Sequence, residues 1–162
     1  MPLIDPLTWA AVMAHENTLL NPPSKPEMIS AFQTKHGVVL PASHREFLAR
    51  GNGGCVGFIR LFGIGCPDGL DLDLEVSEMR SELESMADGP VFPFSNNWGG
   101  SYFCYDLRVP LGHDYPVLLW NHEYSEEPEW RPMLWQKYAT NFNHFLRRVS
   151  SESGDEPYPS CE

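Results

Sequence analysis

The sequence is poor in basic residues. Among 162 residues, 11 Lys and Arg stand against 22 Asp and Glu, which gives a formal charge of −11. Proteins that follow the phosphates of a nucleic acid need clustered Lys and Arg, and anionic membrane surfaces attract the same residues. The deficit therefore argues against direct binding to nucleic acid or to a membrane surface. An acidic balance instead favours a basic protein partner, or it serves solubility alone.

Long apolar runs and cysteine motifs are missing as well. No stretch approaches the run of about 18 apolar residues that a transmembrane helix needs. The start, Met-Pro-Leu-Ile-Asp-Pro, lacks the basic end and apolar core of a signal peptide. The cysteines form neither a CxxC pair nor a zinc-ligand spacing; they are Cys55, Cys66, Cys104 and Cys161. We therefore expect a cytoplasmic protein with free thiols, no metal and no other cofactor.

What the sequence does contain is enough apolar material for one folded core. Hydrophobic residues make up 42% of the chain, aromatic residues 12% and charged residues only 20%. Disordered chains combine low hydrophobicity with high net charge, so this composition argues against global disorder. At about 150 residues per domain, the length predicts a single domain. We expect that domain to be a monomer.

The first third of the chain predicts helices. Apolar spacing favours a helix within residues 5–20. Ser24 is the expected N-cap of a second helix, which Gly37 ends because glycine readily adopts a left-handed backbone. Ser43 is the expected N-cap of a third helix, where Glu46 completes a capping box.

The remainder alternates between strand and helix patterns. In chain order we expect a short β run at 56–63, an acidic helix at 71–86, a hairpin of strands at 91–95 and 101–107, a buried strand at 116–121 that contains Trp120, and a final helix at 142–149. Trp135 is expected in the core. This order predicts an α+β domain in which a mostly antiparallel sheet packs against N-terminal helices and a C-terminal helix. The boundaries are an N-terminal extension at 1–25, the domain at 26–150 and a flexible acidic tail at 151–162.

Two acidic segments are candidate surfaces for a partner. Residues 68–88 hold eight acids and one Arg, and residues 123–130 hold four acids beside two aromatic residues. Acids with aromatic anchors have the composition of an interface hot spot, although a solvated helix face or loop is the alternative. The candidate partner-binding residues are Asp68, Asp71, Asp73 and Glu75 in the first segment, and Glu123, Tyr124, Glu126, Glu127, Glu129 and Trp130 in the second.

Trp98 is a further candidate, since it stands at the tip of the expected hairpin within Asn-Asn-Trp-Gly-Gly. An exposed Trp in a loop is a typical interface anchor. The alternative is that its ring folds back over the sheet edge, because tryptophan is usually largely buried.

No pattern in the sequence indicates catalysis. The six histidines form neither HxH nor HExxH, and the glycine clusters lack the form of a phosphate-binding loop. A metal site from His113, Asp114, His122 and Glu123 is conceivable, but its spacing matches no closed zinc pattern. A thiolate at Cys104 activated by His122 is the other alternative, although flanking aromatics favour a buried, inert thiol. We expect no catalytic residue and no enzymatic activity.

The ordered motifs resemble the SUKH superfamily, which includes bacterial toxin-immunity proteins and relatives of a yeast cell-wall regulator. The matching stretches are Ile29 to Phe32, Gly37 to Leu48, Asn52 to Gly54, Leu61 to Gly63, Phe92 to Ser95, Gly99 to Leu107, Pro116-Val117 and Phe142 to Leu146. Two positions depart from the pattern: Gln33 stands where Glu is frequent, and Ser101 where Asp is frequent. If those acids contact a partner in relatives, the contacts are missing here.

The resemblance implies a non-enzymatic protein that binds and neutralises a cognate toxin, often a nuclease. Such a toxin has a basic surface for phosphate, which acidic side chains can mimic. The alternatives are a regulatory scaffold that binds a cellular enzyme and, third, a small hydrolase that uses His122 and nearby acids.

Overall fold

The computed structural model describes residues 4–67, 70–112, 114–125 and 128–151, with the backbone alone at 130–131. In these residues the strands form one antiparallel sheet whose spatial order follows the chain. The strands are β1 (Leu19–Leu20), β2 (Gly54–Val56), β3 (Ile59–Leu61), β4 (Val91–Asn97), β5 (Tyr102–Asp106), β6 (Val117–Trp120) and β7 (Trp135–Ala139). The helices are α1 (Pro6–Ala14), α2 (Pro26–His36), α3 (Ala42–Arg50), α4 (Leu72–Ala87) and α5 (Phe142–Ser151), and the 3₁₀ helices η1 (His122–Tyr124) and η2 (Pro128–Met133) precede β7.

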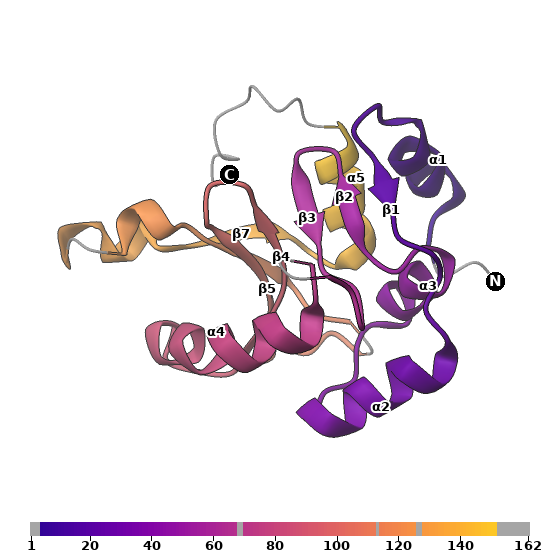
Figure 1. Ribbon diagram of the computed structural model, residues 1–162. Helices are drawn as coiled ribbons and strands as arrows, with labels where there is room; N and C mark the ends of the chain where they lie inside the picture. Colours follow the sequence, from indigo (N-terminus) through magenta and orange to yellow (C-terminus); the bar gives the residue numbers. More distant parts are fainter. Residues whose placement is uncertain (1–3, 68–69, 113, 126–127, 152–162) are drawn as a thin grey trace.

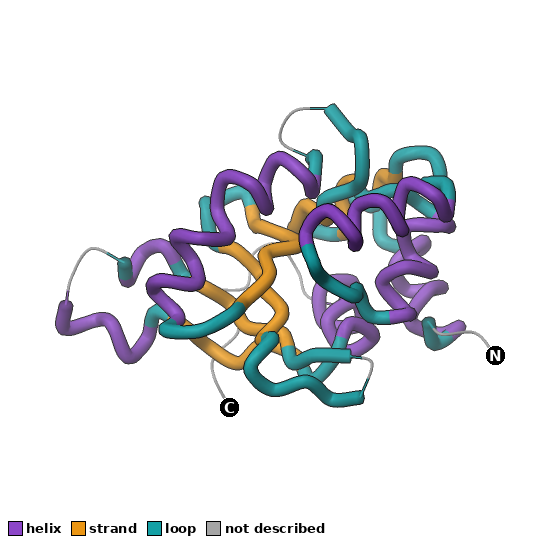
Figure 2. Tube along the Cα trace, turned by 90° about the horizontal axis from the view of Figure 1, so that it is seen from below, coloured by secondary structure: helices purple, strands orange, loops and turns teal. Residues whose placement is uncertain are grey.

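Helices cover both faces of the sheet. Along β6, Val117 and Leu119 pack in the larger apolar cluster with α1, α3 and α5, whereas Leu118 and Trp120 pack in a smaller cluster with α4. Successive residues of a strand point to opposite faces, so an unbroken apolar run requires cover on both sides. Figure 1 shows α4 on one side of the sheet and α5 with α1 on the other, and Figure 2 gives the view from below.

The α+β prediction is confirmed, together with most of its elements. The acidic helix, the β4–β5 hairpin, the buried strand β6 and the final helix all form close to their expected bounds. Gly37 ends α2 with φ of 61°, as predicted, and Trp120 is buried. No helix in the described ranges has the length and apolar composition to cross a bilayer.

The predicted helix over residues 5–20 is wrong in its second half. Asp5 caps α1 by accepting the Leu7 N–H at 2.9 Å, and the helix ends at Ala14. Leu19 and Leu20 instead form β1, which pairs with β2. Pairing with a strand more than 30 residues away decides their conformation, and helical spacing within the segment cannot show it. Because α1 also packs on α5, the residues before the second helix are part of the packed structure.

The predicted serine caps are also wrong. Lys25 and Pro41 occupy the N-cap positions of α2 and α3, while Ser24 and Ser43 are buried. Pro in the first turn of α2 has its backbone angle preset and lacks the N–H that a serine cap would satisfy. The Glu46 carboxylate is used elsewhere, since it accepts the Ile4 N–H at 2.9 Å.

Two strand predictions need correction. The single β run at 56–63 is a hairpin of β2 and β3, which turns at Gly57 with φ of 60°. The edge strand β7 went unpredicted because its sequence, Trp-Gln-Lys-Tyr-Ala, carries two polar residues and no long apolar run. Trp135, expected in the core, is half-buried on this strand.

Candidate protein-binding face

Trp98 is an exposed aromatic residue in the turn between β4 and β5. Its side chain is 66% exposed, so the alternative of a ring folded over the sheet edge is wrong. The Asn97 side chain shapes the turn by accepting the N–H groups of Gly99 and Ser101, each at 3.0 Å. The Arg60 guanidinium lies 4.7 Å from the centre of the Trp98 ring. This cation–π contact holds the ring in place without burying it.

Arg60 connects Trp98 with the α4 side of the sheet. Its Nε donates to Asn96 Oδ1 at 2.8 Å, and Asn96 is directly opposite Tyr102 in the β4–β5 pair. The Tyr102 hydroxyl in turn donates to Glu75 of α4 at 2.8 Å. Burial, and then the Glu75 carboxylate, raise the pKa of Tyr102, which keeps the hydroxyl protonated as a donor. Glu75 and Trp98, predicted independently, are therefore connected through Tyr102, Asn96 and Arg60.

The second acidic segment begins beside the same turn. The Ser101 hydroxyl lies 2.9 Å from His122 Nδ1 and accepts the His122 backbone N–H at 3.2 Å, so the turn is fixed to η1. Glu123 is exposed, whereas the half-buried Tyr124 packs in the α4-side cluster together with Met79 of α4. The two acidic segments thus each pack a side chain against the same apolar cluster on the α4 side of the sheet.

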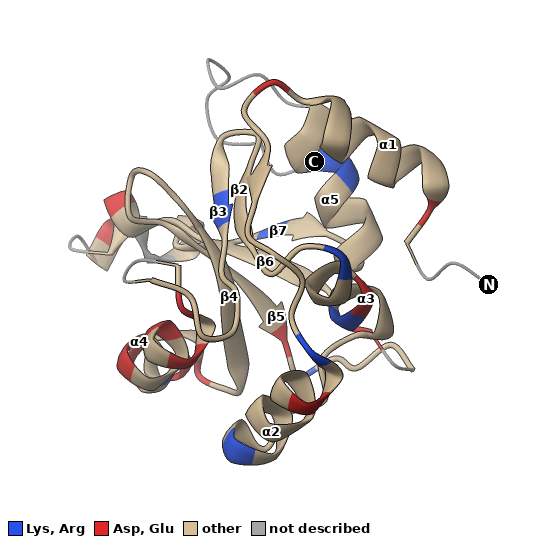
Figure 3. Cartoon of the chain, turned by 45° about the vertical axis from the view of Figure 1, so that its right-hand side comes forward, with Lys and Arg blue, Asp and Glu red and all other residues tan. Residues whose placement is uncertain are grey.

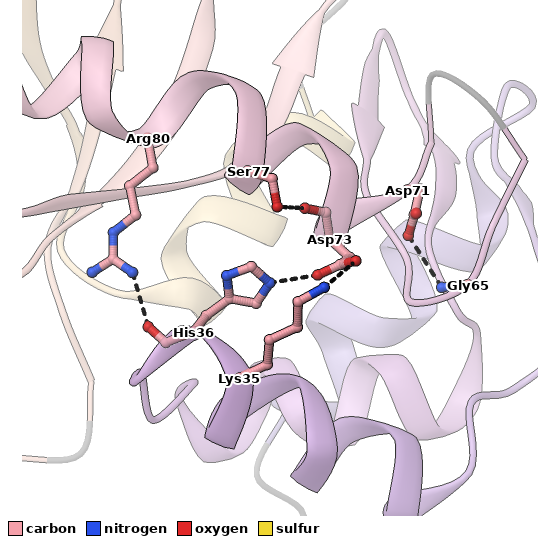
Figure 4. A network of polar contacts seen from close by, with 7 residues as sticks. All are labelled: Lys35, His36, Gly65, Asp71, Asp73, Ser77 and Arg80. Carbon is pink, nitrogen blue, oxygen red and sulfur yellow. Dashed lines mark hydrogen bonds and ion pairs between the residues drawn. The ribbon is translucent and has the colours of Figure 1, made fainter.

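Most predicted acids of the first segment hold α4 in place (Figure 4). Asp71 accepts the Gly65 N–H at 3.2 Å. Asp73 accepts from Lys35 at 2.9 Å and contacts His36 at 2.6 Å. The hydrogen bonds from Lys35 and then His36 lower the pKa of Asp73. Together with Glu75, these carboxylates stabilise contacts inside the molecule, which leaves them less available to a partner.

Other acids of the same segments face solvent. Glu78 and Glu82 lie one turn apart on the exposed side of α4, opposite the buried Val76 and Leu83. Exposed Glu123 and Glu129 follow on η1 and η2, and none of these four carboxylates has an ion pair or side-chain hydrogen bond with a described residue. Figure 3 shows acids of α4 and of the 3₁₀ segment on the same side of the molecule.

We call the surface formed by Glu78, Glu82, Glu123, Glu129 and Trp98 the acidic face. Glu78 and Glu82 are two of the eight acids in the first acidic segment, but they were not among the predicted partner-binding residues. Their position on the helix, opposite its apolar stripe, could have identified them as exposed. Four predicted positions lie outside the described residues or side chains: Asp68, Glu126, Glu127 and Trp130.

The two catalytic alternatives find little support in the geometry. Cys104 is fully buried, and burial raises the pKa of its thiol, while His122 bonds to Ser101 instead. Asp114 precedes β6 and His122 follows it, which puts these two proposed metal ligands at opposite ends of one strand; His113 lies outside the described residues. No group of three potential ligands gathers in the part of the chain that the structure describes.

The two positions that depart from the SUKH pattern both have internal partners. Gln33 accepts the Leu40 N–H at 2.8 Å and so fixes the connection from α2 to α3. Ser101 makes the contacts to His122 described above. Both side chains therefore form contacts inside the molecule, and neither replaces the frequent acid as a group that contacts a partner.

Comparison with known proteins identifies the family. No curated protein sequence gives a significant match. The SMI1 / KNR4 family (SUKH-1) matches residues 23–148, which span the chain from the start of α2 into α5 and include every strand except β1. This match covers well over half of the chain, in agreement with the ordered motifs and with the α+β fold. The chain belongs to the SMI1 / KNR4 family (SUKH-1).

Proposed function

We propose that the chain is an immunity protein, which binds a cognate toxin directly and neutralises it. The observation that carries the proposal is the acidic face, which combines the exposed Trp98, held by Arg60, with exposed carboxylates that have no ion pair to a described residue. Membership of a family that includes toxin-immunity proteins supports it. The protein acts as a cytoplasmic monomer and by binding, not by catalysis.

The chemistry of the face suits a nuclease toxin. A nuclease binds the phosphates of its substrate through cationic groups. The glutamates along α4 and η1 carry negative charge, as phosphates do, but they contain no bond that a nuclease cleaves. Long-range attraction would speed the encounter, and burial of Trp98 would slow dissociation, because buried aromatic anchors carry much of the binding energy of an interface.

The experiment is co-expression with the toxin encoded by the neighbouring gene. Glu78→Lys with Glu82→Lys is expected to abolish rescue of growth, whereas the matched double reversal Glu16→Lys with Glu27→Lys changes exposed acids outside the acidic face and is expected to retain rescue. Circular dichroism checks that both variants fold. Full rescue by a folded Glu78/Glu82 variant would remove the α4 part of the face from the interface. A neighbouring product without toxicity would favour the scaffold alternative.

A further inference from the structure

A cavity lies between α2 and α3, which pack side by side (Figure 1). Each helix contributes lining positions spaced i, i+3, i+4 and i+7, beginning at Pro26 in α2 and at Ala42 in α3. Side chains at this spacing share one face of a helix, so two facing stripes border the cavity. Its volume is about 330 Å³, and pockets for small molecules typically measure about 300–1,000 Å³. The cavity therefore has the size of a ligand site, and it shares no residue with the acidic face.

Arg45 of α3 brings a cation to this cavity. Its half-buried side chain forms no ion pair and no hydrogen bond with a described residue. The Nε atom is buried without an acceptor, and a buried polar group that lacks a partner destabilises the structure. The Nη groups at the tip of the guanidinium carry the remaining donors, in the planar fork that binds carboxylates. Among the described residues, the charge of Arg45 therefore has no counterion.

The carboxylate that lines the cavity, Glu46, is engaged elsewhere. One of its oxygens accepts from Arg50, one turn further along α3, and the other accepts the Ile4 N–H at 2.9 Å. Neither Arg50 nor Ile4 lines the cavity. The charged side chains of α3 are two arginines and one glutamate, so the pairing of Glu46 with Arg50 leaves the positive charge of Arg45 uncompensated within this helix.

Gln33 of α2 adds a neutral hydrogen-bond donor. Its Oε1 accepts the Leu40 N–H at 2.8 Å, which fixes the orientation of the amide. Its Nε2 has no acceptor among the described residues and belongs to a side chain that lines the cavity, so it is available to a ligand. Ser30, one turn earlier, contributes an exposed hydroxyl. Helix α2 thus supplies donors to the cavity and no carboxylate.

We propose that this cavity binds a small carboxylic acid with a compact apolar body, in its ionised form. The guanidinium of Arg45 pairs with the carboxylate, to which the Gln33 amide also donates. The body packs against Ile29, Pro26 and Ala42. Arg45 would repel a cationic ligand, and an uncharged ligand would leave its charge without a counterion. Because the cavity is separate from the acidic face, the proposal does not depend on the identity of the toxin.

The first test compares probes that differ in charge. Benzoate carries a carboxylate on a benzene ring, and benzamide has an amide in its place. In an NMR titration at constant ionic strength, benzoate should shift the resonances of the Gln33 side-chain amide and the Arg45 Nε–H with a Kd of about 1 mM, as a ligand of this size allows. Benzamide and inorganic phosphate should bind about tenfold more weakly, because the first lacks the charge and the second lacks the apolar body.

An isosteric variant places a competing carboxylate inside the cavity. Gln33→Glu can still accept the Leu40 N–H, but its negative charge pairs with Arg45 and should weaken benzoate binding by about tenfold. The matched control Thr34→Glu adds the same charge at an exposed position of α2 outside the lining and should retain binding.

Removal of the cation is the complementary test. Arg45→Gln should lose benzoate binding, whereas Arg147→Gln, at an exposed position of α5, should keep it. The proposal is overturned if benzoate gives no saturable shifts, or if benzamide or phosphate binds as tightly as benzoate. It is also overturned if Gln33→Glu binds benzoate like Thr34→Glu, or if Arg45→Gln binds it like Arg147→Gln.

Discussion

Asp73 Oδ1 lies 2.6 Å from Nε2 of His36, a contact that joins the first turn of α4 to the last residue of α2. Lys35 occupies the other oxygen of the same carboxylate at 2.9 Å. Arg80 reinforces the junction by donating to the His36 carbonyl at 3.0 Å. The Asp73 carboxylate is thus one of the groups that orient the helix carrying Glu78 and Glu82.

Replacement of this carboxylate tests the junction. Asp73→Asn should lower the free energy of unfolding by about 0.5–1 kcal/mol, since the side chain is more than a third exposed and solvent screens its ion pairs. The pKa of Asp73 is lower in the folded protein than in the unfolded chain. Its contribution is therefore complete above the unfolded pKa of about 3.9 and is lost progressively as the pH falls from that value through the lower folded pKa. Urea unfolding at pH 7 and pH 3 measures both effects; an equal loss at the two pH values would contradict this account.

The buried His44 predicts a second titration that also lowers stability as the pH falls. Burial lowers the pKa of His44 to about 3, while the ring contacts the Tyr105 hydroxyl at 2.8 Å. Between an unfolded pKa of about 6.5 and the folded value, only the unfolded chain binds the proton, so stability falls by about 1.4 kcal/mol for each unit of acidification. His44→Gln should lose stability at neutral pH but show a shallower slope from pH 6.5 to 4. Parallel slopes in urea-melt series would show that His44 does not cause the acid sensitivity.

Two tryptophans should separate binding from stability. Trp98→Ala removes an exposed ring and should change the unfolding free energy by no more than about 0.5 kcal/mol, while weakening toxin binding by tenfold or so. Trp120→Ala opens a space in the α4-side cluster and should cost about 3–5 kcal/mol. Calorimetric titration with the toxin and thermal melts give the two readouts. A Trp98→Ala variant with wild-type affinity would place the interface elsewhere.

Raising the salt concentration should lower the rate of association with the toxin. If the acidic face steers the encounter, raising ionic strength from about 50 to about 500 mM should slow association by about tenfold while changing dissociation much less. Surface plasmon resonance resolves the two rates. The Glu78→Lys, Glu82→Lys variant should show a weaker salt dependence than the wild type, and an association rate unaffected by salt in the wild type would argue against steering.

The sequence predicts local features of this fold better than its long-range pairings. The apolar spacing of α4 and the glycine at the end of α2 are read within one segment, and both predictions hold. The strand at Leu19 forms by pairing with β2, and Asp73 binds Lys35 and His36 of another helix. Neither feature can be predicted from the residues next to it in the sequence. The site shows the same division. The acidic segments can be identified from the composition. Their connection to Trp98 depends on contacts of Arg60 and Ser101, which the spacing of residues in the sequence does not predict.

The contact between α1 and α5 has a consequence for synthesis on the ribosome. Strands β2 to β6 each pair with a neighbour that has already been translated, so the sheet can grow as the chain emerges. Helix α1 is made before these strands, yet the helix on which it packs is completed only at Ser151. The apolar surface of α1 at Val12 therefore has no cover from α5 while the sheet is being synthesised, and this part of the core closes only after α5 has been made.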